Sequence, residues 1–379
     1  MGYEGAVTQR LPKTMTAVVY RGPNDLRVET LPVPRIGPRE LLVRVAVCGV
    51  CPTDIKKIQH GTVAPPRVLG HETAGVIARV GALVRGFQVG DRVALHHHVP
   101  CLECHACRHR AFAQCPTYRR TGITAGFEPA GGGYAEYVRV MPFVLPGVVP
   151  LPAGNSLVEG ALLEPVNTVL KAVNRLALLP GDQVLVAGQG PIGLMFTRLL
   201  TLRGARVMAT DLLPPRLRLA RRWGASVSLR ADDVGLAAKV ERWTKGRGLD
   251  AVVVAVPSDP LVKEAVGWIR GGGKVLLFAH TRRGGQVALD LAAVCVDEKD
   301  LIGSYSSDVT LQQEVATLVF NRQLDVRELV THEFPLRKTA AAVQLAAHPE
   351  PESLKILVRA WEAGDAGGDA PGREGQHGG

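Results

Sequence analysis

The sequence lacks the long apolar runs that direct a protein into or across a membrane. No segment holds the roughly 20 consecutive apolar residues that a membrane-spanning helix needs. Residues 1–13 also contain no apolar stretch of the kind found in a signal peptide. We therefore expect a cytoplasmic protein without a membrane partner.

Two further absences narrow the range of possible functions. The net charge is +10, but the arginines are scattered along the chain, and no basic stripe is interleaved with aromatic residues, which make up only 5% of the chain. Such a pattern favours a solvated basic surface, so we expect no nucleic-acid partner. No internal repeat is visible, which argues against a repeat architecture.

Cysteine is unevenly distributed. Four of the seven cysteines have the spacing C-x2-C-x2-C-x7-C: Cys101, Cys104, Cys107 and Cys115. Four thiolates close together bind zinc tetrahedrally, whereas disulfides require an oxidising compartment. The pattern predicts a structural zinc lobe over about residues 96–116. Cys48 and Cys295 have no partners at ligand spacing, and we expect both to be buried thiols.

The 379 residues are enough for about two domains. From 16 to 149, short apolar runs separated by Pro and Gly predict an antiparallel, barrel-like β-domain. From about 181, strands alternate with helices, which predicts an α/β domain with a doubly wound parallel sheet. We expect strands at 333–336 and 354–358 to rejoin the first domain. The glycine-rich tail, 363–379, is expected to be disordered.

A glycine motif follows an apolar strand and precedes a helix at the start of the second domain. The predicted cofactor-binding residues are Gly188, Gly190, Pro191, Ile192 and Gly193. Such a motif places a dinucleotide pyrophosphate on a helix N-terminus. Asp211, at the end of the next strand, can accept hydrogen bonds from ribose hydroxyls and repel a 2′-phosphate, which favours NAD over NADP. Asp211 could instead cap the following helix, and Arg216 could screen a phosphate.

Two earlier segments carry ligand chemistry: G-V-C-P-T-D at 49–54 and G-H-E at 70–72. Neither is diagnostic alone. Together with V-G-D-R-V at 89–93, G-G-Y-A-E-Y-V at 132–138, the cysteine lobe and the glycine motif, they resemble the zinc-dependent medium-chain dehydrogenases from about Thr14 to Val358. Glu164 stands where classical alcohol dehydrogenases have a ligand cysteine, so the likeness is strongest to the iditol or sorbitol (polyol) dehydrogenase branch.

The resemblance implies a GroES-like catalytic domain from residues 1–165 and 308–362, and a Rossmann domain from 166–307. It implies two zinc ions per chain, one structural and one catalytic. The catalytic zinc would be held by Cys51 and His71, with carboxylates from Glu72 and Glu164. Either Glu72 ligates directly and Glu164 holds a water on the ion, or the roles are exchanged. As alternatives, Glu72 forms a salt bridge and Glu164 lies at a helix terminus.

Other positions are implied more weakly. Thr53 resembles the hydroxyl that takes the substrate proton, but it could be a capping residue. Lys56 replaces a histidine common in the family's proton path, so the last step would use Lys56 or water. Thr168 resembles a position near the nicotinamide, although a helical threonine fits equally well. Tyr305 either lines the substrate pocket or packs against neighbouring side chains. The run 96–98 of three histidines is interpreted as structural or exposed, because neighbours on a strand point to opposite faces.

The expected function is NAD- and zinc-dependent oxidation of a secondary alcohol, a polyol or sugar alcohol, to a ketone. Threonine, an aldose or a simple secondary alcohol is the alternative substrate on the same scaffold. The zinc-free reductase branch is disfavoured because it has no use for the cysteines, and a zinc-ribbon protein that senses NAD is the alternative from another functional class. The resemblance also implies a homodimer or homotetramer.

Overall fold

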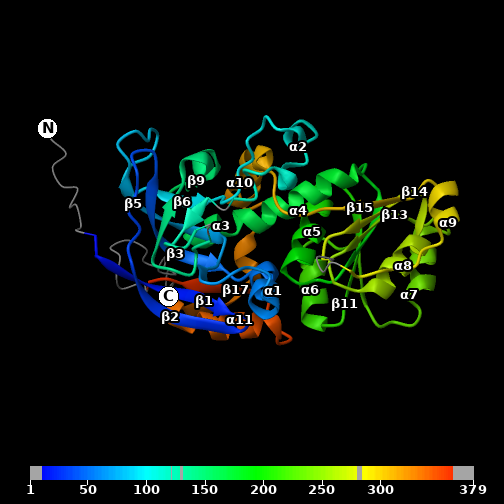
Figure 1. Ribbon diagram of the computed structural model, residues 1–379. Helices are drawn as coiled ribbons and strands as arrows, with labels where there is room; N and C mark the ends of the chain where they lie inside the picture. The colour runs from blue at the N-terminus through cyan, green and yellow to red at the C-terminus, as the bar shows by residue number, and fades with distance from the viewer. Residues whose placement is uncertain (1–10, 121, 129–130, 280–283, 362–379) are drawn as a thin grey trace, which may run out of the picture.

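The structure is a computed structural model that describes residues 11–120, 122–128, 131–279 and 284–361. A β-rich part, mostly blue and cyan, and an α/β part, green to yellow, lie side by side (Figure 1). The tail 363–379, for which we predicted disorder, lies outside the described residues. None of the helices in the described ranges combines the length and apolarity that crossing a membrane requires.

Two sheets form the β-rich part. The smaller has the order β2 (Asp25–Pro32), β1 (Thr14–Gly22) and β4 (Arg67–Val68). The larger runs β16 (Val330–Pro335), β17 (Lys355–Arg359), β3 (Leu41–Gly49), β5 (Glu72–Val80), β6 (Arg92–Leu95) and β9 (Val148–Pro150), with β8 (Tyr137–Val140) also paired to β3 and β7 (Ile123–Thr124) paired to β8. Since β17 pairs antiparallel with β3, the prediction that the last strands rejoin the first part is confirmed.

The segment from Tyr134 to Val140 is a regular strand only in its second half, because the chain changes partner. The Tyr134 carbonyl accepts a hydrogen bond from the amide of Val18 in β1 at 2.8 Å, and Ala135 bridges to the same strand. From Tyr137 onward the chain pairs with β3 instead. The segment therefore joins the two sheets, and only its second half is a regular strand.

A six-stranded parallel sheet forms the α/β part. Its order is β12 (Val227–Arg230), β11 (Arg206–Asp211), β10 (Gln183–Ala187), β13 (Leu249–Val254), β14 (Ile269–Leu277) and β15 (Asp300–Gly303). The helices between these strands are α5 (Pro191–Leu202), α6 (Pro214–Arg222), α7 (Leu236–Thr244), α8 (Asp259–Trp268) and α9 (Leu291–Val296). This is the strand order of a dinucleotide-binding Rossmann sheet, whose ligand crevice lies where the order reverses, beside β10. The predicted doubly wound α/β fold is confirmed.

The remaining helices of the described residues either lie between strands of the β-rich part or lead from one part to the other. They are α1 (Pro52–His60), α2 (His105–Arg108), α3 (Leu157–Ala161), α4 (Leu163–Leu176), α10 (Gln312–Phe320) and α11 (Thr339–Ala347). The apolar side chains of α4, such as Val166 and Leu170, share one buried core with Val47 of β3 and Leu199 of α5. Because α4 packs into both parts, its first turn is held firmly at their junction.

One prediction about cysteine is wrong. Cys295 is exposed, because it lies on α9, a helix with no buried residue. Cys48 is buried, as expected.

Candidate active site

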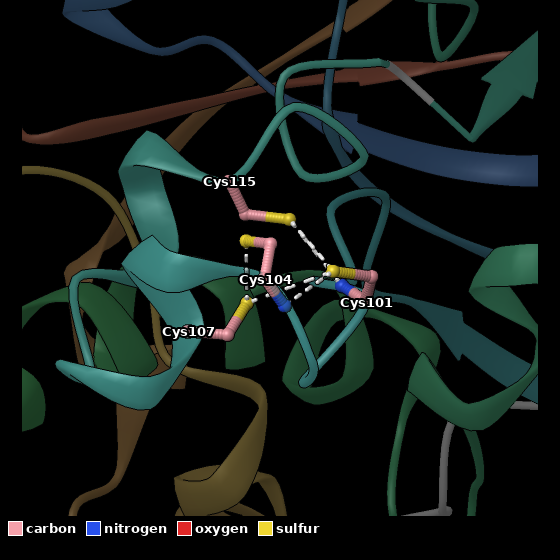
Figure 2. Close-up of side chains that lie close together, drawn as sticks. All are labelled: Cys101, Cys104, Cys107 and Cys115. Carbon is pink, nitrogen blue, oxygen red and sulfur yellow. Dashed lines mark hydrogen bonds between the residues drawn. The ribbon is translucent and has the colours of Figure 1, made fainter.

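The four clustered cysteines lie in a lobe that protrudes from the β-rich part near α2 (Figure 1). Their side chains point toward one another, as Figure 2 shows. All four thiols are free, and their sulfur atoms lie within 4.8 Å of one another. A loop, the short helix α2 and a turn that follows it supply them, so the group is assembled from one short stretch of chain.

The sulfur separations fit a zinc ion. Sγ of Cys104 lies 3.5 Å from Sγ of Cys107, Sγ of Cys115 lies 3.6 Å from Sγ of Cys101, and Cys101 and Cys107 are 3.9 Å apart. A tetrahedron with Zn–S bonds of about 2.3 Å has edges of about 3.8 Å, whereas disulfide sulfurs are about 2 Å apart. The lobe therefore has the donor set and spacing of a closed, structural zinc site.

Hydrogen bonds also prepare these sulfurs for a metal. Backbone amides of Cys101 and Cys104 donate to Sγ of Cys115 and Cys101, each at 3.4 Å. Burial acts to raise the pKa of Cys115, but the bond from Cys101 and those of its other neighbours lower it to about 6. A thiolate is the form that binds metal, so the surroundings of Cys115 favour that form, whereas burial and the hydrogen bonds of neighbouring cysteines raise the pKa of Cys107 to about 12.

A second group of ligand atoms lies where β3 leads into α1 and where β5 begins. One atom each from Cys51, His71 and Glu72 lie within 4.8 Å of one another. Cys51 caps α1, and its Sγ accepts a hydrogen bond from the amide of Thr53 at 3.5 Å. Since β3 and β5 are paired, Gly49 lies opposite Glu72, which brings the cysteine and the histidine together.

Asp54 orients the histidine. Nδ1 of His71 lies 3.1 Å from Oδ2 and 3.2 Å from Oδ1 of Asp54, which is 1% exposed. Burial acts to raise the pKa of Asp54, but His71 lowers it below its ordinary value, so this carboxylate stays charged. With Nδ1 donating to a carboxylate, Nε2 is left to bind a metal, an arrangement common at metal-ligating histidines. We did not single out Asp54, although it ends the same G-V-C-P-T-D motif.

Glu72 has a partner that the sequence did not reveal. Lys355, on β17, forms an ion pair with Oε2 of Glu72 and donates to the carbonyl of Val50 at 2.9 Å. Both side chains are almost completely buried. A Cβ at Gly49 would overlap Oε2 of Glu72. Glycine at position 49 is therefore what makes room for the Glu72 carboxylate between the two strands.

Glu164 lies in the first turn of α4 and faces the same group. Burial raises the pKa of its carboxyl to about 7; His71 lowers this pKa and Glu72 raises it. Glu164 is not among the ligand atoms that lie within 4.8 Å of one another. Both alternatives given for these glutamates are present, since Glu72 forms a salt bridge with Lys355 and Glu164 lies at the start of α4. Of the two, only Glu72 places an oxygen within 4.8 Å of the ligand atoms of Cys51 and His71.

The glycine motif has the geometry that a dinucleotide turn requires. Gly188 has a φ of +88°, and a Cβ at Gly193 would collide with the carbonyl of Gly188. Gly190 caps α5, which begins at Pro191 and continues through Ile192. The turn therefore depends on glycine at its first and third positions, and the helix N-terminus is available for phosphate.

The Asp211 carboxylate is already engaged by the backbone. Its Oδ2 accepts from the amide of Gln189 at 2.6 Å, and its Oδ1 accepts from the amide of Leu213, the residue before α6, at 2.8 Å. Nη1 of Arg216 is 4.0 Å from Oδ2 of Asp211, and its Nη2 donates to the carbonyl of Ser353 at 3.0 Å. A cavity of about 250 Å³ adjoins Arg216, between α6 and the approach to β17.

The weaker predicted positions are distributed as follows. Thr168 donates to the carbonyl of Glu164 at 3.2 Å, as a helical threonine does. Tyr305 is 57% exposed. Lys56 is half-buried on α1, as is Thr53 next to Cys51. In the run 96–98, the first two histidines are buried.

Comparison with known proteins identifies the family. Residues 37–153 match the model of the alcohol dehydrogenase GroES-like domain, and residues 191–321 match that of zinc-binding dehydrogenases. The chain is 30% identical over 358 residues to a sorbitol dehydrogenase of Bacillus subtilis (strain 168), covering 93% of this chain and 99% of the relative. The chain belongs to the zinc-dependent medium-chain dehydrogenases. It is therefore an oxidoreductase of the alcohol and polyol dehydrogenase type, with a small-molecule substrate, as the motifs predicted.

Solved structures of this family share the whole fold. A 2R,3R-butanediol dehydrogenase from Bacillus subtilis is 25% identical with a TM-score of 0.79, covering 91% of this chain and 99% of that chain. A zinc-binding dehydrogenase from Sinorhizobium meliloti 1021, bound to NADP, is 26% identical with a TM-score of 0.80, covering 92% of this chain and 100% of that one.

Proposed function

We propose that the protein oxidises a secondary alcohol of a polyol or sugar alcohol to a ketone, with NAD as the hydride acceptor. One observation carries this proposal. The same short segment before and at the start of β17 touches both halves of the site: the Ser353 carbonyl accepts from Arg216 beside the glycine turn, and Lys355 pairs with Glu72. The ligand group and the nucleotide turn thus face one junction. The sorbitol and butanediol dehydrogenases among the similar proteins support the substrate class.

At this junction we assign the catalytic zinc to Cys51, His71 and Glu72. These residues would hold a zinc ion that supplies Lewis acidity, which would lower the pKa of the substrate hydroxyl. Asp54 holds His71 in the ligating orientation. Glu164, with a carboxyl pKa of about 7, can hold or release a proton beside the reacting hydroxyl.

Proton removal from the substrate is assigned to Thr53. Its amide donates to Sγ of Cys51, and the residue is half-buried, so Thr53 lies beside the ligand group. Lys56, one turn further along α1, or water would then pass the proton to solvent. Replacing Thr53 by Ala should lower kcat with little change in bound zinc, whereas Thr53→Ser should restore most of the activity.

NAD is proposed over NADP because the Asp211 carboxylate at the end of β11 would repel a 2′-phosphate. Its two backbone hydrogen bonds fix it there and leave lone pairs for ribose hydroxyls. The ratio of kcat/KM for the two cofactors measures this directly. A preference for NADP would mean that Arg216 dominates and would overturn the assignment.

The decisive experiment is an NADH-absorbance assay with polyols, sugars, threonine and simple secondary alcohols, with and without a chelator. We expect a polyol to be the best substrate, chelator-sensitive turnover, and two zinc ions per chain by elemental analysis. If threonine or an aldose were the best substrate, the assignment to polyols would be wrong. One zinc or none would contradict the metal assignment.

The assembly is proposed to be a homodimer or homotetramer in the cytoplasm. Strand β15 is at the edge of its sheet, and Leu301 on it and Leu291 and Val296 on α9 are exposed. Pairing of two such edges would continue the sheet across an interface. Light scattering after gel filtration tests this.

We place the domain boundaries at 165/166 and 307/308.

A further inference from the structure

A cavity of about 250 Å³ lies between helix α6 of the α/β part and two segments of the β-rich part, namely β16 and the residues just before β17. None of its described lining residues is a glycine of the nucleotide turn or a member of either metal-ligand group. Among them, only Arg216 was also predicted to bind the cofactor. The cavity is therefore a separate place in the molecule, which the proposed function does not use.

Three arginines of α6 line this cavity, and few of their hydrogen-bond donors are used. Arg218 is exposed, and its guanidinium makes no hydrogen bond or ion pair with any described residue. Arg222 pairs through Nη2 with the exposed Glu328 at 3.3 Å. Arg216 donates from Nη2 to the carbonyl of Ser353 at 3.0 Å. Each guanidinium carries five N–H donors, so the helix side of the cavity is rich in donors that a ligand can use.

The opposite wall of the cavity has a different chemistry. It contains the exposed carboxylate of Glu352 and the hydroxyl of Thr331, whose oxygen accepts a hydrogen bond from the amide of Leu354 at 2.9 Å. The other lining side chains are prolines and leucines. A ligand that fits this cavity has an acceptor-rich anionic group for the arginines, hydroxyl groups that donate to the carboxylate, and C–H surface for the apolar side chains.

We propose that the cavity binds a small phosphate monoester that carries hydroxyl groups. Arg218 and Arg222 are four residues apart and lie on one face of α6, where their planar forks can bind phosphate oxygens in pairs. A phosphate offers three strong acceptor oxygens and nearly two negative charges, and so uses more of these donors than a carboxylate does. The volume is just below the roughly 300–1,000 Å³ of sites for drug-sized ligands, which suits a smaller molecule. The bound ligand bridges α6 and the approach to β17.

The test measures binding of glycerol 3-phosphate to the zinc-loaded, full-length protein by calorimetry, with saturating NADH and with sodium chloride used to keep the ionic strength constant. NADH occupies the phosphate position at the nucleotide turn, so the remaining binding reports on the cavity. We expect one molecule per chain, bound more tightly than inorganic phosphate. Arg218→Gln and Arg222→Gln should each weaken binding about 10-fold, because a hydrogen bond between charged groups is lost. Arg242→Gln, at an exposed arginine of α7 that does not line the cavity, is the matched control and should bind like the wild type.

Glu352→Ala tests the hydroxyl part of the proposal. It removes the acceptor for the ligand's hydroxyl groups, so glycerol 3-phosphate should lose its advantage over inorganic phosphate. Wild-type affinity in both Arg218→Gln and Arg222→Gln would overturn the site, and so would loss of binding when NADH is present. Equal affinity of the wild-type protein for inorganic phosphate and glycerol 3-phosphate would overturn the assignment to a monoester. All these positions are exposed, so the unfolding temperature of each variant should stay unchanged and show that the fold is intact.

Discussion

The two metal-ligand groups of this chain are built in opposite ways. The lobe takes its four sulfurs from residues 101–115, and backbone amides of the same segment donate to two of them. The second group takes Cys51 from the cap of α1, just after β3, His71 and Glu72 from the start of β5, and the Lys355 counter-ion from β17. The first is local, and the second exists only once three strands have paired.

The difference matches what each site must do. A structural zinc site closes its coordination with four protein ligands, and a short loop can supply all of them. A catalytic site must leave a position open and needs ionisable groups around it, and in the proposed site these are Asp54, Lys355 and Glu164. Distant strands can place such groups on several sides of an ion, which a single loop cannot do.

The largest effect on activity should come from a variant that removes a ligand from only one of the two groups. Cys51→Ser should lower kcat/KM by roughly 10⁴-fold, since the Lewis-acid contribution of the metal is several kcal/mol, and should leave the unfolding temperature little changed. Cys104→Ser should release the other zinc and lower the unfolding temperature, because metal binding contributes to folding of the lobe. Zinc content and thermal unfolding measure both. If Cys104→Ser lost both zinc ions, the two sites would not be independent of each other.

The second prediction concerns the buried ion pair. Lys355→Met leaves the Glu72 charge buried and unpaired, which should cost about 3–5 kcal/mol of unfolding free energy in the metal-free protein. Arg203→Met, which breaks an exposed pair with Glu314, is the control and should cost about 0–1 kcal/mol. Urea denaturation measures both. Adding Glu72→Gln to Lys355→Met should recover most of the loss, and an equal cost for the two single variants would mean that the buried pair is not special.

This contrast also explains which parts could be predicted from the sequence. The cysteine spacing is local, so it identified the lobe without knowledge of the fold. The alternation of strands and helices predicted the parallel sheet for the same reason. The sequence could not reveal Lys355 as the partner of Glu72, because that contact depends on β17 pairing with β3. The sequence did not reveal that Cys295 is exposed, because an apolar segment has the same residue pattern on an exposed helix as on a buried one.

The third prediction tests the space that the assembled site needs. In Gly49→Ala the new methyl overlaps the Glu72 carboxylate, so the carboxylate must move away from Cys51 and His71. We expect a 10- to 100-fold loss of zinc affinity at this site, the range seen when a supporting group of a metal ligand is disturbed. Competition with a chelator measures it. Gly22→Ala is the control, since a Cβ there meets nothing within 4 Å, and an equal effect of both variants would exclude this explanation.

The smallest effect should come from detaching the lobe from the rest of the molecule. The hydroxyl of Tyr118 lies 2.7 Å from Oγ of Ser306 and 2.9 Å from Oγ of Ser307, and it accepts from the amide of Ser307 at 3.1 Å. Tyr118→Phe removes these bonds and keeps the ring beside the cysteines, so it should cost about 1 kcal/mol of unfolding free energy. Both zinc ions should remain, because the lobe holds its metal with its own residues. Tyr305→Phe, at an exposed tyrosine, should change neither stability nor zinc content. Loss of the structural zinc in Tyr118→Phe would show that the lobe depends on its contacts with the α/β part, and the distinction between a local and an assembled site would then no longer hold.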